Sequence, residues 1–178
     1  MAISLEKLDP EFRDILESVL KKCAQKGVTM VPYFGERSPK EQAMLWRQSR
    51  TLFEIEERVA ELKEGEGHFL AHCISCVGPQ HGPRVTNAIP GYSWHQWHEA
   101  VDCYWERDGR AEWDPDVEAE KKGYRIYADE AAKAGLTAGG YWQSLRDWPH
   151  VQKRAASSPA TGGFSLAAID ARMQALYG

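Results

Sequence analysis

The sequence has no long apolar run, no basic cluster and few cysteines, and each of these deficits argues against a class of protein. No apolar stretch approaches the roughly 20 residues that cross a bilayer. The formal net charge of -4, without a lysine- and arginine-rich stretch, gives no general attraction to nucleic acid or anionic lipid. The N-terminal region lacks a basic stretch followed by an apolar core and a cleavage site. We therefore expect a protein that starts in the cytoplasm without a signal peptide, with no nucleic acid partner and no membrane insertion.

The four cysteines, at positions 23, 73, 76 and 103, are too few and too unevenly spaced for a secreted disulfide framework. The segment HCISC groups His72, Cys73 and Cys76, and it could hold a second, structural zinc if His68 or His81 joined. Because a second Cys-x-x-Cys pair is missing, we instead expect a loop with free thiols or one local disulfide.

A chain of 178 residues with 43% hydrophobic content can bury one sizeable core, so we expect a single catalytic domain over residues 1–178. Helical periodicity and capping residues alternate with short extended segments, which indicates an α+β fold with a small central antiparallel sheet flanked by helices. Residues 52–82 look like a surface insertion, helical over 52–64, and glycines and prolines predict a loop over 65–92. The expected helices are 10–26, 39–46, 52–64, 118–135 and 165–177, and the expected extended segments are 28–36, 100–105 and 142–152.

The segment SWHQWHEAVD, residues 93–102, is unusually rich in groups that bind metals. A catalytic zinc takes three nitrogen or oxygen ligands and leaves a fourth position to water, and a separate carboxylate accepts the proton of that water. His95 and Asp102 are seven positions apart, so the chain must turn over residues 96–99 for both to reach one ion. Downstream, Asp147 and His150 lie three positions apart in DWPH, where a histidine can bind the ion beside a carboxylate.

These two motifs resemble those of the zinc peptidases that comprise D-alanyl-D-alanine carboxypeptidases and L-alanyl-D-glutamate endopeptidases, including phage endolysins and vancomycin-resistance dipeptidases. The resemblance extends to ERSPKEQ, similar to the family's arginine-bearing turn before a helix, and to VTNAIPGYS, similar to the loop before the zinc motif. It covers most of the chain between about residues 28 and 152. It implies the zinc peptidase fold of the Hedgehog and D,D-peptidase type.

Carried over residue by residue, the resemblance implies that His95, Asp102 and His150 bind zinc and that Asp147 is the general base. Arg37 matches the family's arginine that steadies the oxyanion or the substrate carbonyl. Ser93 matches a serine near the substrate.

One position departs from the family pattern, because His98 stands where the family has glycine. Either the turn accepts a histidine in a strained conformation, at about 1 to 3 kcal/mol, or the turn is unstrained here. The imidazole of His98 could also compete for the metal or lie at the surface or in a substrate cleft.

Each site residue also has a purely structural explanation. Asp102 could be a buried acid capped by backbone amides, and His95 and His150 could be core histidines with satisfied hydrogen bonds. Arg37 could pair at the surface with Glu36 or Glu41, and Ser93 could bond its own backbone. Four tryptophans flank the motifs and could line a cleft for a sugar or peptide, although core packing is their commoner role: Trp94, Trp97, Trp142 and Trp148.

The leading interpretation is a bacteriolytic zinc metallopeptidase that cleaves the L-alanyl-D-glutamate bond of the peptidoglycan stem peptide, as an endolysin does. The alternatives are a D-alanyl-D-alanine carboxypeptidase or dipeptidase, and a non-catalytic wall-binding module that keeps the fold. A base at Asp147 favours an enzyme, because a binding module needs none. Without a signal peptide, we expect release to the cell wall by phage-type lysis, whereas a cytosolic dipeptidase is the other intracellular option. The oligomeric state stays open.

Overall fold

The fold of the chain was analysed in a computed structural model that describes residues 3–117, 120, 122–143 and 146–178. The chain divides into two compact units, each formed by two separate stretches of sequence. One unit comprises Met1–Glu36 and His98–Ala155, and the other comprises Arg37–Trp97 and Ala156–Gly178. No helix among the described residues is long and apolar enough to cross a membrane.

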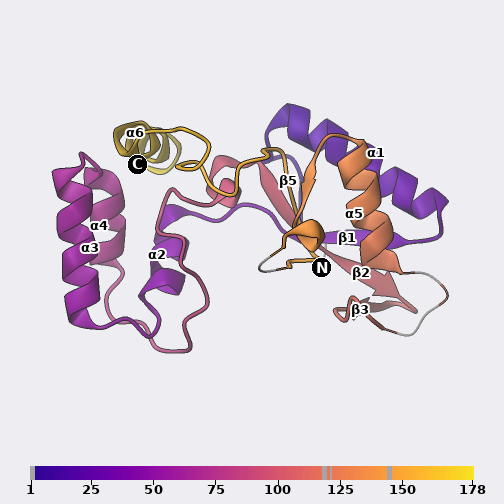
Figure 1. The fold of residues 1–178 in the computed structure, drawn as a ribbon, viewed down its shortest axis with the longest axis horizontal. Coiled ribbons are helices and arrows are strands. Elements are labelled where there is room, and N and C mark those ends of the chain that lie inside the picture. The colour runs from indigo at the N-terminus through magenta and orange to yellow at the C-terminus, as the bar shows by residue number, and fades with distance from the viewer. Residues whose placement is uncertain (1–2, 118–119, 121, 144–145) are drawn as a thin grey trace. The chain divides into compact units, whose positions relative to one another are not determined.

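The first unit is built on a five-stranded antiparallel sheet, as the sequence predicts (Figure 1). The strand order is β1-β2-β5-β4, and β3 pairs with the remaining length of β2. The long strand β2 therefore bonds to three others and fixes their register. The strands are β1 (Thr29–Phe34), β2 (Ala100–Arg107), β3 (Arg110–Glu112), β4 (Thr137–Ala138) and β5 (His150–Gln152).

Two helices, α1 (Pro10–Gln25) and α5 (Gly123–Lys133), supply the rest of the core of this unit. Helix α1 begins where the sequence predicts, because the Asp9 side chain accepts a hydrogen bond from the Phe12 amide and Pro10 occupies the first turn. The apolar side chains of both helices pack with Val101, Cys103 and Trp105 of β2: Phe12, Leu16, Val19, Tyr124 and Tyr127. The short 3-10 turn η2 (Gly139–Tyr141) follows β4.

The second unit is helical. Helices α2 (Pro39–Arg47) and α3 (Leu52–Glu64) each begin with a capping box, formed by Ser38 with Glu41 and by Thr51 with Glu54. Both confirm helices expected from the sequence. The C-terminal helix α6 (Leu166–Tyr177) starts at the predicted cap, Ser165.

Helix α4 (His68–Cys76) lies where the sequence analysis expected a loop, so that prediction is wrong. Its buried residues follow a helical stripe and pack against α2, α3 and α6. This short apolar pattern is flanked by Gly67 and Gly78. The glycines and prolines around it therefore led to the prediction of a loop. The buried residues of α4 are Leu70, Ala71, Cys73 and Ile74.

Two extended or helical predictions are shorter in the structure than in the sequence analysis. The extended segment expected over 142–152 contributes only β5 among its described residues, and the helix expected from 118 begins at Gly123. Residues 118, 119, 121, 144 and 145, which belong to these predictions, lie outside the described residues. Strand β3 was not expected, because three residues after a tight turn carry too little periodicity.

Candidate metal centre

Asp102 and His150 face each other across neighbouring strands. They are register partners in the antiparallel pair of β2 and β5, so their side chains leave the same face of the sheet. The Nδ1 atom of His150 lies 2.9 Å from Oδ1 of Asp102. The Asp102 carboxylate is therefore bonded to an imidazole.

Gln152 fixes which nitrogen of His150 carries a hydrogen. The Gln152 amide nitrogen donates to the Arg154 carbonyl oxygen at 2.6 Å, which turns its amide oxygen towards Nε2 of His150 at 3.0 Å. Nε2 must then donate, and the neutral imidazole presents the lone pair of Nδ1 to the Asp102 carboxylate. Two acceptors at this distance attract one another only through a cation, either a proton on Nδ1 or a metal ion bound by both. The pair therefore fits a metal site.

The surroundings of His150 favour its protonated form when no metal is bound. Burial of the ring disfavours the imidazolium, but the hydrogen bond and charge of Asp102, the Gln152 oxygen and the charge of Asp147 outweigh it and raise the pKa of His150. Positive charge is thus stabilised at the position between the two acceptors.

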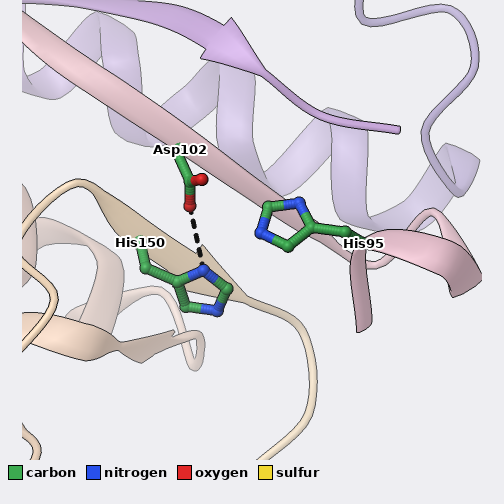
Figure 2. Close-up of side chains that lie close together, drawn as sticks. All are labelled: His95, Asp102 and His150. Carbon is green, nitrogen blue, oxygen red and sulfur yellow. Dashed lines mark hydrogen bonds and ion pairs between the residues drawn. The ribbon is translucent and has the colours of Figure 1, made fainter. Parts of the chain in front are cut away.

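His95 adds a third ligand. It lies in the 3-10 turn η1 (Trp94–Trp97), is buried, and has its ring turned towards the other two side chains, as Figure 2 shows. One ligand atom from each of His95, Asp102 and His150 lies within 4.8 Å of the other two. Across the part of the chain that the structure describes, this is the one such group of three or more histidine, cysteine or acidic side chains.

The turn between His95 and Asp102 exists as the sequence predicts, and His98 adopts a left-handed conformation within it, with φ of 62°. This explains why a glycine suits the position and identifies the strained alternative as the one that occurs. The carbonyl oxygen of His98 accepts from the Asp9 amide at 2.9 Å, and its Nε2 lies 3.7 Å from Oε1 of Glu36. His98 is not part of the group of converging ligands.

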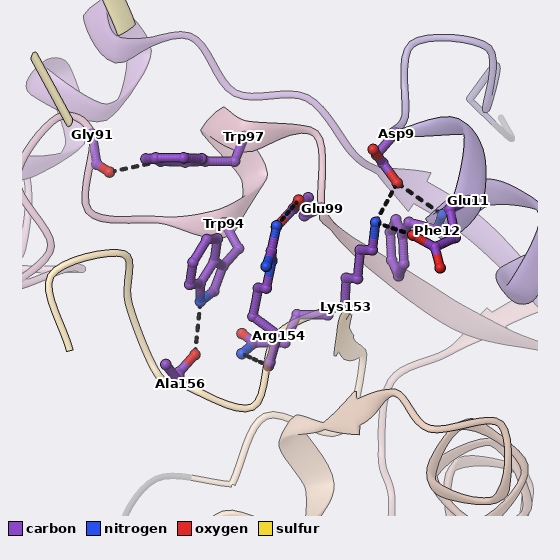
Figure 3. Close-up of polar contacts among 11 residues, drawn as sticks. Asp9, Glu11, Phe12, Gly91, Trp94, Trp97, Glu99, Lys153, Arg154 and Ala156 are labelled. Atoms are coloured by element: carbon purple, nitrogen blue, oxygen red, sulfur yellow. Dashed lines mark hydrogen bonds and ion pairs between the residues drawn. The ribbon is translucent and has the colours of Figure 1, made fainter. Parts of the chain in front are cut away.

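Ion pairs hold the strand that follows this turn to the end of β5 (Figure 3). Glu99 accepts two hydrogen bonds from the Arg154 guanidinium, at 2.7 and 2.8 Å, and its carbonyl oxygen accepts from the Lys153 amide at 2.8 Å. Lys153 in turn bonds Asp9 at 2.9 Å and Glu11 at 2.7 Å at the start of α1. The strand ends that carry Asp102 and His150 are therefore tied to one another and to a helix.

Asp147 lies three residues before His150 and is half-buried. Its amide donates to the Gly139 carbonyl oxygen at 3.1 Å, and its own carbonyl oxygen accepts from the His150 amide at 3.2 Å. A side chain at Gly139 would collide with the Asp147 backbone, so this turn needs glycine. The Asp147 carboxylate lies near enough to His150 to contribute to raising its pKa.

Arg37 precedes α2, and its Nη1 donates to Oε1 of Gln42 at 3.0 Å. Of its acidic neighbours, Glu36 bonds Lys7 and Glu41 bonds Ser38.

Gln42 is a residue that the sequence analysis missed. It is fully buried, and its amide nitrogen donates to the Ala88 carbonyl oxygen at 2.6 Å. It thereby links the arginine to the loop that precedes the metal-binding motif. The signal for it is a glutamine on the buried face of α2, where the pattern calls for an apolar residue.

Ser93 is half-buried, and its carbonyl oxygen accepts from the Gln96 amide at 3.0 Å. Of the flanking tryptophans, Trp94, Trp97 and Trp148 are buried, whereas Trp142 is half-buried with its ring 5.1 Å from that of His150. Trp94 and Trp97 are further held by hydrogen bonds to Ala156 and Gly91 (Figure 3).

The cysteines are all free thiols. Burial raises the pKa of Cys73 to about 11, and the neighbouring Cys76 adds to this, so Cys73 is a protonated thiol at neutral pH. The HCISC segment, which lies in α4, forms no group of converging ligands among the described residues.

Two imidazoles and one carboxylate that converge, with a second carboxylate close by, define the class of zinc-type hydrolytic centres. The comparison with known families narrows this class. Residues 5–143 match the family VanY, D-alanyl-D-alanine carboxypeptidase. This is more than half of the chain, so the chain belongs to the VanY family and is a peptidase. The match contains His95 and Asp102 but ends before Asp147 and His150.

One curated protein and two solved structures are similar to this chain. The chain is 27% identical over 149 residues to the peptidoglycan L-alanyl-D-glutamate endopeptidase CwlK of Bacillus subtilis (strain 168). This match covers 82% of this chain and 72% of CwlK. The crystal structure of the L-Ala D-Glu endopeptidase ChiX of Serratia marcescens is 19% identical, with a TM-score of 0.43 and coverage of 83% and 81% of the two chains. A mutant of the vancomycin resistance D,D-pentapeptidase VanY in complex with Zn(II) is 18% identical, with a TM-score of 0.47 and coverage of 95% and 87%.

Proposed function

We propose that this peptidase is a zinc enzyme that cleaves the peptidoglycan stem peptide at the L-alanyl-D-glutamate bond, with His95, Asp102 and His150 as its zinc ligands. The observation that carries the proposal is the convergence of these three groups within 4.8 Å. Three nitrogen and oxygen ligands suit a catalytic zinc, since a structural zinc takes four, most often with cysteine. When bound, zinc supplies a Lewis acid and a water that ionises near neutral pH.

Asp147 is the general base in this proposal. Its carboxylate accepts the proton of the attacking water and returns it to the departing amine. Its position supports the role. The backbone hydrogen bonds of Asp147 to Gly139 and His150 fix the turn that carries Asp147, three residues before a proposed ligand. A carboxylate in contact with bulk water on one side can also exchange its proton between turnovers, and Asp147 is half-buried.

Arg37 would stabilise the negative charge that develops on the carbonyl oxygen of the scissile bond. A single donor of this kind is commonly worth about 100- to 1,000-fold in rate. The bond from Arg37 to the buried Gln42 supports the role, because a guanidinium fixed in advance loses little freedom when it binds. Ser93, which immediately precedes η1, would contact the substrate beside His95.

Two observations bear on the bond that is cleaved. The relative CwlK is an L-alanyl-D-glutamate endopeptidase, which favours the internal bond near the glycan. The family description names a D-alanyl-D-alanine carboxypeptidase, which makes removal of the terminal D-alanine the second candidate. A non-catalytic wall-binding module would not require the carboxylate at Asp147.

The test is to incubate purified protein with peptidoglycan and to identify the new termini by mass spectrometry. We expect ends from L-alanine and D-glutamate that disappear with chelator and return with zinc. The matched variant Asp147→Asn keeps the shape of the side chain and should lose at least about 100-fold in rate while binding zinc normally. Cleavage by this variant at the parent rate would refute the base assignment, and release of free D-alanine would select the carboxypeptidase.

A further inference from the structure

The face of the sheet opposite α1 and α5 carries a cluster of three aromatic side chains, Tyr33, Tyr104 and Trp113, termed here the aromatic platform. Trp113 meets Tyr33 edge to face at 4.9 Å between ring centroids and lies 5.7 Å from Tyr104. The two tyrosines are 6.2 Å apart. Tyr33 comes from β1 and Tyr104 from β2, whereas Trp113 follows β3, so all three belong to the first unit.

The platform is open to solvent. Trp113 is 50% exposed, and Tyr33 and Tyr104 are half-buried, although rings of this size normally contribute to a core. The alternation along β2 explains the exposure, because Tyr104 lies between Cys103 and Trp105, which both enter the core. The edge-to-face packing fixes the ring of Trp113 and leaves much of its apolar surface in water.

The platform is continuous with the metal centre. Asp102 and Tyr104 are two positions apart on β2 and therefore share a face, at a spacing of about 7 Å for an extended strand. Trp113 follows Glu112, the register partner of Trp105, and its ring lies beside that of Tyr104. A ligand that extends from Asp102 along β2 towards Tyr104 therefore meets the platform.

We propose that the aromatic platform binds a sugar ring of the peptidoglycan glycan strand while the attached stem peptide lies at the metal centre. This inference rests on the proposed function. An aromatic ring packs well against the C–H face of a pyranose, and the tyrosine hydroxyls can bond its hydroxyl groups. None of the three platform side chains is charged, which suits an uncharged and rigid sugar ring.

Distance favours the sugar over the more distant parts of the stem peptide. The first residue of the stem, L-alanine, is joined through a lactyl group to N-acetylmuramic acid. With at most about 3.6 Å per extended residue, the sugar lies roughly 7 Å from the L-alanyl-D-glutamate bond. That reach matches the step from Asp102 to Tyr104. The terminal D-alanyl bond lies three residues further along the stem, about 18 Å from the sugar in extended form, so occupation of the platform selects the internal bond.

The test compares Trp113→Ala with the parent on two substrates, an N-acetylmuramoyl peptide and the same peptide without the sugar. We expect kcat/KM for the sugar-bearing substrate to fall about tenfold and that for the free peptide to change less than about twofold. Phe53→Ala is the matched control, because Phe53 is an aromatic side chain 71% exposed on α3. It should leave both substrates unchanged.

A binding measurement separates this inference from the proposed function. Titration with a tetramer of N-acetylglucosamine should change the tryptophan fluorescence of the parent and of Phe53→Ala in a saturable way, with or without zinc. Trp113→Ala should lose this response, and Trp113→Phe should regain binding detected by calorimetry. If the parent cleaves neither peptide but binds the tetramer through Trp113, the proposed function fails and the platform stands.

Equal losses on both substrates, or no loss, would overturn the inference and leave the platform as packing for the β2–β3 hairpin. Thermal melts of each variant exclude unfolding as the cause of a loss. If Trp113→Ala does not fold, Trp113→Leu replaces it, because leucine keeps apolar bulk without a ring. The same pair of substrates and the same titration then decide the outcome.

Discussion

The two faces of the sheet in the first unit differ in what they do, although the same strands supply both. On β2, Val101, Cys103 and Trp105 enter the core beneath α1 and α5, whereas Asp102 and Tyr104 leave the opposite face. The core face excludes water so completely that burial raises the pKa of the Cys103 thiol far above its ordinary range, and the charge of the nearby Asp102 adds to this. On the opposite face, Asp102 contacts His150 and Tyr104 is half-buried. Residues that stabilise the core and residues of the candidate site therefore alternate along β2.

This separation makes the two faces testable with substitutions at adjacent positions. Changes on the core face should reduce the free energy of unfolding and leave metal binding intact. Changes on the opposite face should do the reverse.

The largest effect is expected for Asp102→Ala. Asp102 is a proposed zinc ligand, and without it the protein should not hold the zinc that lowers the pKa of the attacking water. Hydrolysis should therefore fall by roughly 1,000-fold or more. Because Asp102 contributes nothing to the apolar core, the midpoint of thermal unfolding of the metal-free protein should change less than for a substitution on the core face. Hydrolysis assays and calorimetry on the same preparation check both parts, and a large loss of stability would erase the contrast between the faces.

The next effect concerns Gln152, which orients His150 without being a proposed ligand. Gln152→Leu keeps the volume but removes the acceptor of the Nε2 hydrogen, so the reactive nitrogen is no longer fixed. Groups of this kind typically contribute 10- to 100-fold to metal affinity. Competition with a chelating dye measures the change. An unaltered zinc affinity would show that the backbone alone positions the ring.

On the core face, Val101→Ala should lower the free energy of unfolding by about 2 kcal/mol, because Val101 is fully buried beside Asp102 in sequence. Urea denaturation gives this value. Zinc content per folded chain should stay that of the parent, and a parallel loss of zinc would mean that the faces are coupled.

The smallest effect is expected in the turn that leads from His95 into β2. His98 has a positive φ, which costs a residue with a side chain about 1 kcal/mol relative to glycine. His98→Gly should therefore be more stable than His98→Ala by about this amount. The comparison of these two variants cancels the loss of the imidazole and its contact with Glu36. Equal stabilities would show that the turn tolerates a side chain without strain.

The sequence predicted the elements with strong local signals. The capped helices at Pro10, Pro39, Leu52 and Leu166, and the alternation of β2, follow from hydrogen bonds and periodicities that span a few residues. Helix α4 was missed because its apolar stripe is short and lies between glycines, and its burial depends on packing against three other helices, of which α6 is far away in sequence.

The candidate ligands His95, Asp102 and His150 could be named from a resemblance, but their convergence could not. It depends on the register that places Asp102 opposite His150, which only the folded sheet sets. Gln42 and Gln152 were missed for a similar reason. A buried glutamine has no periodic signal, and its role appears only when its partners are in place.

The most direct test of the account is the zinc content of the purified protein, measured by mass spectrometry after dialysis against a small excess of zinc. The account predicts one zinc per chain for the parent, for His98→Ala and for Cys73→Ala, and almost none for His95→Ala, Asp102→Ala or His150→Ala. A parent without zinc, or full zinc content in any of these three ligand variants, would contradict it.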